Sequence, residues 1–411
     1  MIKINGQRLW QRLMDMATLG ATPKGGVCRE SLTDQDKAGR DLFIQWCTTA
    51  GCTIEIDRIG NIFAIRAGTE TQEDPILVGS HLDSQPTGGK YDGVYGVLAG
   101  LELIETLNDH QIKTKHPIIV ASWTNEEGSR FAPGLTGSAV HIGRTSLAEA
   151  YQIQDKKGKR LAEELKRIGY QGQLQPGSLQ FHASFEVHIE QGPILEAEAL
   201  DIGVVTAVQG TRWYDINLYG KETHAGTTPM EIRVDPVRAA LPIVAGLYSI
   251  ADQHLPDIRM TIGFLDASPG VKNTVPGLLK ISIDNRHPDD RVLDQIKAEI
   301  QHLLEVHLKA SPVRGEFLDV MQSPAVQFAP ACIEAVAQAS RKLGLKAKKM
   351  ISGAGHDAAL LSQVCPTSMI FIPCKDGLSH NELESALPKD VENGANVLLH
   401  AVLEADRLEF S

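Results

Sequence analysis

The sequence predicts an α/β protein with two domains: a large, mainly parallel sheet and a smaller module inserted into it. Three observations predict this fold class. Strand and helix signals alternate through the first half of the chain, a β-α-β-β-α-β succession occupies residues 210–323, and the strand–helix character returns after Pro324. Because an insertion divides its host domain, we expect residues 1–209 and 324–411 to fold together.

The first half of the chain alternates buried strands with an amphipathic helix. An apolar stretch at 75–80 ends in Gly-Ser, which is typical of a short buried strand. From Asp92 a helical stripe of apolar residues runs through Leu107, and a second buried strand is predicted at 117–123. Strand–helix–strand units of this kind favour a parallel sheet that is covered on both faces.

The succession between residues 210 and 323 is that of a ferredoxin-like module. Alternating apolar and polar residues predict half-buried strands, and an apolar period near 3.6 predicts helices. The expected elements are strands at 213–219, 259–266, 278–285 and 317–321 and helices at 235–253 and 289–308. A further buried strand at 369–373 then belongs to the larger domain.

Composition excludes several classes of protein. The 411 residues are 42% apolar and 22% charged, which is typical of globular proteins and not of disordered or fibrous chains. The net charge of −11 makes nucleic acid an unsuitable partner. The N-terminus has no signal-like apolar core and no stretch is long enough to cross a bilayer, so we expect a cytoplasmic protein without membrane contacts. Six sparse cysteines indicate reduced thiols.

Five short clusters carry side chains that are suited to chemistry. They are Gly79–Ser84, Gly88–Gly93, Thr124–Ser129, Val187–Pro193 and Gly377–Asn381. Several of them follow buried strands, where sheet proteins bind ligands. Each cluster alone also has an ordinary structural explanation, such as a histidine that caps a turn. Together they supply three histidines and two or three carboxylates, the ligand set of a dinuclear zinc or manganese site.

Neighbouring residues within these clusters suggest specific roles. Asp83 is placed to accept the second ring N–H of His81 and so fix its tautomer. Asp92 stands at a helix start, where it either caps the helix or bridges two cations. Glu126 and Glu127 are adjacent acids that repel each other unless a cation or a shared proton intervenes. A metal on one and a general-base role for the other would explain the pair, although an exposed loop would tolerate it too.

The motifs occur in an order that resembles a known family. They are His81-Leu82-Asp83, Asp92-Gly93, Glu126-Glu127-Gly128, His188-Ile189-Glu190-Gln191-Gly192, His224-Ala225-Gly226-Thr227-Thr228-Pro229-Met230 and Ser379-His380. The chain resembles the dinuclear-metal amidohydrolases related to aminoacylase and carboxypeptidase G. Within them it is most similar to the branch of N-carbamoyl-L-amino-acid hydrolases, allantoate and ureidoglycolate amidohydrolases and β-ureidopropionases. The resemblance covers essentially the whole chain.

The resemblance implies a metal centre and a general base. The implied metal ligands are His81, Asp92, Glu127, His188 and His380. Asp92 bridges two divalent ions, for which zinc, manganese, cobalt and nickel are all suitable. Glu127 and His380 complete one ligand set, and the other two histidines complete the second. Glu126 is then the general base that takes a proton from water.

The resemblance also makes the inserted module a lid and dimerisation domain. In a homodimer, His224 would reach the partner's active site and stabilise the developing oxyanion. Gln191, Asn273 and Arg286 match positions that hold substrate in this branch. His356 lies in another family motif, to which we assign no defined role.

Without the resemblance, two of these residues have simpler interpretations. Arg286 would form a surface ion pair with Asp284 or Asp289, and His224 would be an ordinary loop histidine.

The favoured substrate is an N-carbamoyl-L-amino acid, which is hydrolysed to the amino acid, ammonia and carbon dioxide. Allantoate amidohydrolases tend to carry a second arginine where Trp213 stands, which weakens that alternative. A β-ureidopropionase substrate is longer by one methylene, which a pocket discriminates by only about 1–3 kcal/mol. An aminoacylase or dipeptidase is disfavoured by His188 and Gln191, and a metal-free scaffold by the retained ligands.

Overall fold

The computed structural model describes residues 1–70 and 72–409. The chain divides into two compact units. Unit 1 comprises Met1–Thr206 and Gln327–Ser411, and unit 2 comprises Ala207–Val326. These bounds lie close to the expected 1–209, 210–323 and 324–411. No helix in the described part of the chain is both long and apolar enough to cross a bilayer.

Unit 1 is built on a nine-stranded sheet whose centre is parallel, which confirms the predicted fold class. In the centre β3 pairs in parallel with β4 and β5, and β15 pairs in parallel with β5, whereas β2 and β6 join this centre antiparallel. The four central strands are buried along their whole length, as expected for a sheet covered on both faces. The strand order is β1 (Thr53–Ile56), β2 (Ile62–Arg66), β4 (Ile118–Trp123), β3 (Ile76–His81), β5 (Ala183–Ile189), β15 (Thr367–Ile372), β6 (Ile202–Val208) and β13 (Val326–Gln327), with β14 (Ala347–Ser352) also paired to β6.

Helices cover this sheet. α3 (Val94–Asp109) packs on β3, and α12 (Pro388–Ala405) packs on β5 and β15. α3 begins two residues after Asp92, and its N-cap is Gly93, so Asp92 does not cap the helix and its carboxylate is available for other contacts. The other helices of unit 1 are α1 (Gly6–Met16), α2 (Asp34–Thr49), α4 (Thr136–His141), α5 (Leu147–Gln152), α6 (Leu161–Ile168), α7 (Ile194–Ala197), α10 (Pro330–Lys342) and α11 (Asp357–Leu361).

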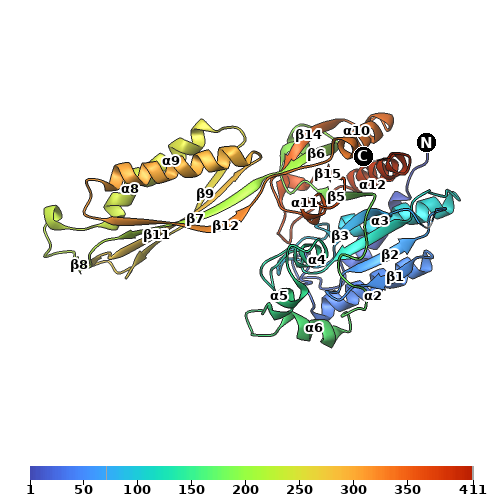
Figure 1. The fold of residues 1–411 in the computed structure, drawn as a ribbon, viewed down its shortest axis with the longest axis horizontal. Coiled ribbons are helices and arrows are strands. Elements are labelled where there is room, and N and C mark those ends of the chain that lie inside the picture. The colour runs from blue at the N-terminus through green and yellow to red at the C-terminus, as the bar shows by residue number, and fades with distance from the viewer. Residues whose placement is uncertain (71, 410–411) are drawn as a thin grey trace. The chain divides into compact units, whose positions relative to one another are not determined.

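Unit 2 has the expected β-α-β-β-α-β order, with both long helices on one face of a four-stranded antiparallel sheet (Figure 1). The elements are β7 (Gly210–Tyr219), α8 (Pro236–Gln253), β9 (Arg259–Ser268), β11 (Leu278–His287), α9 (Asp290–Leu308) and β12 (Arg314–Ser323), and the sheet order is β12-β7-β11-β9. Tyr214, Ile216 and Leu218 alternate inward on β7 and pack against apolar side chains of both helices. The first and last strands are longer than predicted because each pairs along its whole length.

A second, two-stranded pairing in unit 2 was not predicted. β8 (Thr223–His224) pairs antiparallel with β10 (Thr274–Val275). Two residues on each side are too few for a periodic pattern, so the sequence carries no strand signal there.

His141, at the end of α4, is a buried histidine outside the predicted site. It is 6% exposed and packs against the rings of Phe63, Trp123 and Phe181. Its Nδ1 accepts the N–H of Gly177 at 3.3 Å, which holds the ring neutral. Burial lowers the pKa of His141 to about 4.

The His141→Phe variant should resist acid better than the wild-type protein. The pKa of His141 is lower in the folded chain than in the unfolded chain, so the stability that it contributes is present above about pH 6.5 and is lost as the pH falls toward 4. Over that interval the wild type should lose roughly 3 kcal/mol more than the variant. Urea unfolding at pH 7 and pH 4.5 measures the difference, with the exposed His110→Phe as control. Equal losses in wild type and His141→Phe would contradict the prediction.

Candidate metal centre

The five predicted metal ligands converge at the carboxyl ends of the central strands of unit 1. His81 is the last residue of β3, and His188 lies near the end of β5. Glu127 follows β4, Asp92 lies between β3 and α3, and His380 follows β15. Neighbouring parallel strands end at the same edge of a sheet, so residues far apart in the sequence meet there.

Asp92 lies at the centre of this group, and its two oxygens face different partners. Oδ1 is 3.0 Å from Nε2 of His188 and 3.7 Å from Nε2 of His81. Oδ2 is 3.4 Å from Nε2 of His380, which is also 3.4 Å from Oε2 of Glu127. Asp92 therefore belongs to two triads, one with His81 and His188 and the other with Glu127 and His380. Within each triad the ligand atoms lie within 4.8 Å of one another. This is the arrangement of a carboxylate shared between two cation sites.

The two buried histidines present the nitrogen that a metal needs. Nδ1 of His81 lies 2.9 Å from the carbonyl oxygen of Asp83, and Nδ1 of His188 lies 2.9 Å from the carbonyl oxygen of Ile189. Because a carbonyl only accepts, Nδ1 carries a proton in each ring, so in the neutral ring Nε2 holds the lone pair that a metal would bind. The residues present therefore fit a metal centre.

The prediction that the Asp83 carboxylate fixes His81 is wrong in one detail. The carboxylate lies 3.9 Å from Nδ1 of His81, whereas the backbone carbonyl of the same residue makes the closer contact. The Asp83 carboxylate instead accepts the backbone N–H groups of Glu126 and Glu127, each at 3.3 Å. It thus shapes the turn that presents both acids.

The adjacent acids are half-buried, with side chains 10% and 4% exposed, so their interpretation as an exposed loop pair is wrong. Oε2 of Glu126 lies 3.4 Å from Nε2 of His81. Burial raises the pKa of Glu126 well above its usual range and that of Glu127 to about 8, and neighbouring carboxylates add to both shifts. In the described part of the chain, the ion pairs of Asp92, Glu126 and Glu127 are all with histidines. Such a group of buried acids favours bound cations.

Unusual backbone conformations occur where the site is formed. Asn125, Gln191 and His380 have φ values of 56°, 55° and 52°, in the left-handed region that non-glycine residues rarely adopt. Strain of this kind concentrates at functional sites. Gly93 also has a positive φ, and a Cβ there would overlap the imidazole of His81.

Gln191 lies inside the site. Its Nε2 donates to Oδ2 of Asp92 at 2.9 Å and to Oγ of Ser379 at 3.1 Å. Its Oε1 is buried without a hydrogen-bond partner among the described residues. An amide in this position has an acceptor available for a substrate.

Gln85, which no motif in the sequence singled out, contacts Glu127 twice. Its side-chain Nε2 donates to Oε2 of Glu127 at 2.7 Å, and its backbone N–H donates to Oε1 at 3.1 Å. The signal available was its place two residues after Asp83, although spacing alone does not predict a contact with a distant turn.

His356 packs against His188, one of the predicted metal ligands. Its ring lies edge-on to that of His188, with ring centroids 4.6 Å apart, and its Nε2 lies 3.1 Å from Oγ of Ser352. Burial holds the pKa of His356 well below its usual range. His356, His188 and Glu186 form a third group of ligand-type atoms within 4.8 Å.

The other predicted substrate residues belong to unit 2, where His224 and Asn273 lie side by side. β8 pairs His224 with Thr274, and the N–H of Ala225 donates to the carbonyl of Asn273 at 2.9 Å. Nδ1 of His224 accepts the N–H of Gly226 at 3.0 Å. The ring proton of neutral His224 is therefore on Nε2.

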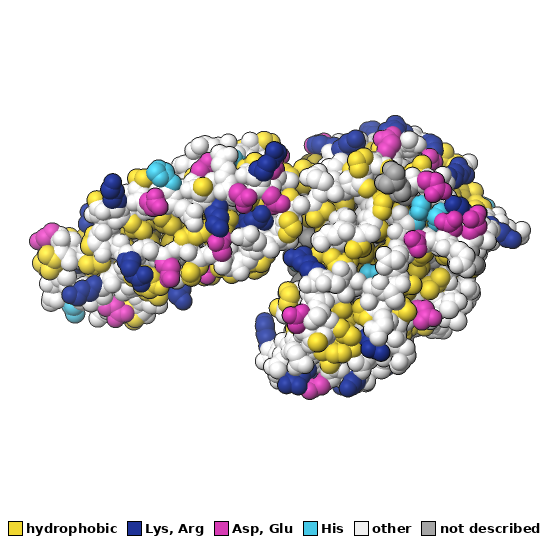
Figure 2. All heavy atoms as spheres, in the orientation of Figure 1, with side chains coloured by type: hydrophobic (Ala, Val, Ile, Leu, Met, Phe, Trp, Pro, Cys, Tyr) yellow, Lys and Arg dark blue, Asp and Glu magenta, His cyan; other side chains and the backbone are white. Residues whose placement is uncertain are grey.

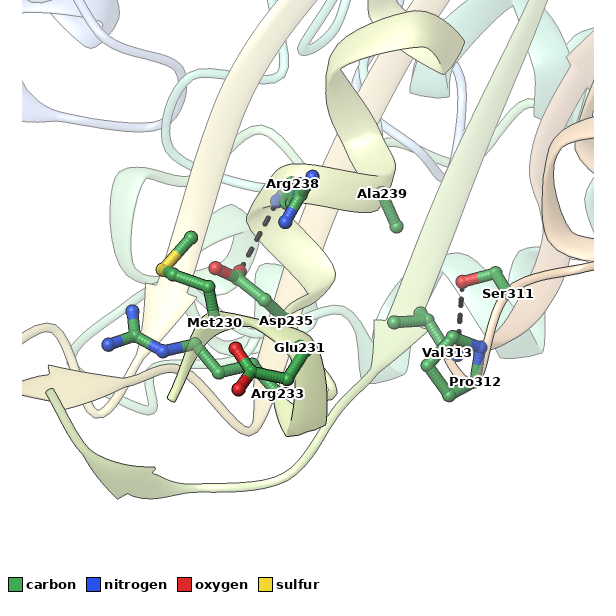
Figure 3. A pocket seen from close by; sticks show the side chains of 9 residues that line it. All are labelled: Met230, Glu231, Arg233, Asp235, Arg238, Ala239, Ser311, Pro312 and Val313. Atoms are coloured by element: carbon green, nitrogen blue, oxygen red, sulfur yellow. Dashed lines mark hydrogen bonds between the residues drawn. The ribbon is translucent and has the colours of Figure 1, made fainter. Parts of the chain in front are cut away.

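Arg233 holds the segment that follows His224. Its Nε donates to the carbonyl of Thr228 at 2.9 Å, and its Nη2 donates to that of Ala225 at 2.6 Å. The same arginine lines a cavity of about 300 Å³ (Figure 3), whose walls also include Met230. The cavity therefore lies beside a segment fixed by these bonds.

Arg286 is ion-paired, as its simpler interpretation predicted. Its Nη2 lies 2.8 Å from Oδ2 of Asp284 on the same strand. Asp289, the alternative partner, instead pairs with Arg291 at 2.6 Å.

Comparison with known proteins gives a consistent result. The model of Peptidase family M20/M25/M40 matches residues 77–404. An N-carbamoyl-L-amino-acid amidohydrolase of Rhizobium meliloti is 45% identical over 98% of this chain and 97% of its own. Its counterpart in Geobacillus stearothermophilus is 37% identical over 97% and 98%. A solved amidase of the hydantoinase/carbamoylase family from Burkholderia multivorans is 49% identical, with a TM-score of 0.95 over all of both chains.

Two further proteins are less similar in sequence to this chain. Ureidoglycolate hydrolase of Arabidopsis thaliana is 33% identical over 97% of this chain and 86% of its own. Aminopeptidase PepT from Bacillus cereus, at 17% identity and a TM-score of 0.66, shares the fold. The match to the family model and the extent of these identities confirm the resemblance seen in the sequence: the chain belongs to peptidase family M20/M25/M40 and is similar to N-carbamoyl-L-amino-acid amidohydrolases.

Proposed function

We propose that the protein hydrolyses the carbamoyl C–N bond of N-carbamoyl-L-amino acids with the help of two divalent metal ions. The observation that carries this proposal is the shared carboxylate of Asp92, which has one oxygen toward each triad of ligand atoms. The names of the similar amidohydrolases from Rhizobium meliloti and Geobacillus stearothermophilus support the substrate class.

Five side chains would hold the ions. His81 and His188 with Oδ1 of Asp92 would bind one, and Glu127 and His380 with Oδ2 would bind the other. Imidazole and carboxylate ligands suit zinc or manganese, and also cobalt or nickel. When bound, such ions polarise a carbonyl group and make water more acidic.

Glu126 acts as general base in the proposed reaction. It takes a proton from the attacking water and delivers it to the leaving nitrogen. Its burial and raised pKa support this role, because the carboxylate then holds the proton strongly enough to pass it on. Gln191 orients the ureido group with its unpartnered Oε1.

Unit 2 supplies the remaining substrate contacts. The Nε2–H of His224 donates to the developing oxyanion, and Asn273 offers both a donor and an acceptor. Arg286 binds the substrate carboxylate through parallel hydrogen bonds, in competition with its present partner Asp284.

Unit 2 also serves as lid and dimerisation domain, with His224 acting in the partner's active site. Its two edge strands support this part of the proposal. Phe264 and Leu265 on β9 and Val320 on β12 are exposed apolar side chains, and Figure 2 shows apolar side chains reaching the surface of this unit. A second copy would cover edges of this kind. The proposed dimer acts in the cytoplasm, where the six free cysteines stay reduced.

A second candidate is a hydrolase of allantoate, ureidoglycolate or N-carbamoyl-β-alanine with the same site. An allantoate amidohydrolase of Bacillus subtilis, 32% identical over 93% of this chain, favours keeping it. Allantoate has a second ureido group, however, and the half-exposed Trp213 offers a poor partner for that group.

Ammonia release from a substrate panel tests the proposal. Manganese-loaded protein should hydrolyse N-carbamoyl-L-amino acids, and should leave a D-enantiomer and an N-acetyl amino acid intact. Faster hydrolysis of allantoate or N-carbamoyl-β-alanine would replace the first candidate with the second. No turnover of any of these compounds by the metal-loaded protein would overturn both.

Replacing Glu126 or Glu127 by glutamine, one at a time, should separate the effect on catalysis from the effect on metal binding. Glu126→Gln should retain the wild-type metal content and lose about 10²- to 10⁴-fold in kcat, because only the proton acceptor is removed. The matched Glu127→Gln should lower the metal content instead. Elemental analysis and kcat measured on the same preparations check both. A wild-type kcat for Glu126→Gln would remove Glu126 as the base.

Mixed dimers test whether His224 acts across the interface. His224→Ala and Asp92→Ala should each be inactive as homodimers, because each lacks one half of every composite site. After random mixing, half of the dimers contain one complete site, so about a quarter of wild-type activity should return. If both variants are folded and exchange subunits but no activity returns, the cross-dimer role is wrong.

A further inference from the structure

Glu384 is a buried carboxylate that belongs to neither ligand triad of the metal centre. It follows His380 in the loop before α12 and is only 4% exposed. Its Oε1 accepts the backbone N–H of Tyr91 at 2.9 Å and that of Asp92 at 3.1 Å. One carboxylate oxygen thereby fixes the backbone at the residue on which both triads depend.

The second oxygen of Glu384 reaches the other side of the centre. Oε2 lies 3.0 Å from Oγ of Ser379, and the same hydroxyl lies 2.9 Å from Oδ2 of Asp92. Ser379 directly precedes His380. Glu384 therefore connects the backbone of Asp92 to the segment that presents His380, although the two segments are nearly 300 positions apart.

Gly89 provides the space that this carboxylate occupies. A Cβ at position 89 would overlap the carboxyl group of Glu384. Gly88 and Gly89 open one of the five clusters seen in the sequence, and no metal ligand or substrate contact accounts for Gly89. The close approach of Glu384 accounts for it.

We propose that Glu384 is a positioning residue that sets the distance between Asp92 and His380 and so determines the affinity for metal, without itself binding metal or substrate. The proposal rests on the metal centre proposed above. Hydrogen bonds from backbone N–H groups to a buried carboxylate are strong and directional. Removal of the carboxylate would leave two buried N–H groups without acceptors and would take one partner from Ser379, which would keep only its contacts with Asp92 and Gln191, so both segments could shift.

Metal affinity of Glu384 variants tests this role directly. Competition with a chromogenic chelator for Mn²⁺ should give a Kd about 10- to 100-fold weaker for Glu384→Ala than for the wild type. Glu384→Gln should stay within a few-fold of the wild type, because its amide oxygen still accepts both N–H groups. Glu382→Ala is the matched control in the same loop: its partner is Lys24 at 3.7 Å, and its Kd should not change.

Gly89→Ala provides a second test that leaves Glu384 in place. The added methyl group should displace the carboxylate and weaken Mn²⁺ binding, as Glu384→Ala does. In the double variant Gly89→Ala/Glu384→Ala, the added methyl group no longer overlaps a carboxyl group. Its Mn²⁺ affinity should therefore be little weaker than that of Glu384→Ala alone. Additive losses would show that Gly89 acts independently of Glu384 and would count against the proposal.

The outcomes separate this inference from the proposed function. A wild-type protein that binds Mn²⁺, with an equal Kd for Glu384→Ala, overturns the positioning role alone. The same holds if Glu384→Ala lowers only the unfolding midpoint, since that result indicates a purely structural residue. A wild-type protein that binds no divalent metal overturns both. If Glu384→Ala does not fold, the Kd values of Gly89→Ala and Glu384→Gln decide the question.

Discussion

The burial of several carboxylates around one shared group, Asp92, is the constraint on which the site depends. Asp83, Glu126 and Glu127 lie close to it, and burial raises the pKa of each of these three. Acids in such a group repel one another when they are ionised. Protonated imidazoles offset this charge around Asp92, Glu126 and Glu127, whereas Arg40 also offsets that of Asp83. Bound divalent cations would offset the repulsion between the ionised acids. Cation binding therefore explains why so many carboxylates lie together, which packing alone does not.

Backbone groups, more than side chains, fix the orientation of the candidate metal ligands. Two carbonyl oxygens set the tautomers of His81 and His188, and two N–H groups hold the carboxylate of Asp83 beneath the adjacent acids. The left-handed conformations of Asn125 and His380 aim the segments that follow β4 and β15. The central strands thus serve as a rigid support, and the turns at their ends set the orientation of the side chains in the site.

Those elements and residues that depend on a local pattern could be predicted from the sequence. Apolar stretches identified β3, β4 and β15, and the split strand–helix order identified unit 2. The candidate metal ligands could be named because each lies in a short motif, and the structure brings these residues together. The contacts of Gln85 with Glu127 and the pairing of β8 with β10 were missed, since each joins segments distant along the chain. Tertiary arrangement sets such contacts, and no local period encodes them.

The place of β15 in the sheet has a consequence for synthesis of the chain on the ribosome. β15 lies between β5 and β6, yet it is made after the whole of unit 2. Until residue 372 has emerged, β5 and β6 expose unpaired backbone edges to the surrounding solution, whereas unit 2 already has all of its strands. Nascent chains of this protein therefore expose aggregation-prone strand edges until β15, near the end of the chain, pairs with them. Chaperones that shield open sheet edges would act before β15 is made.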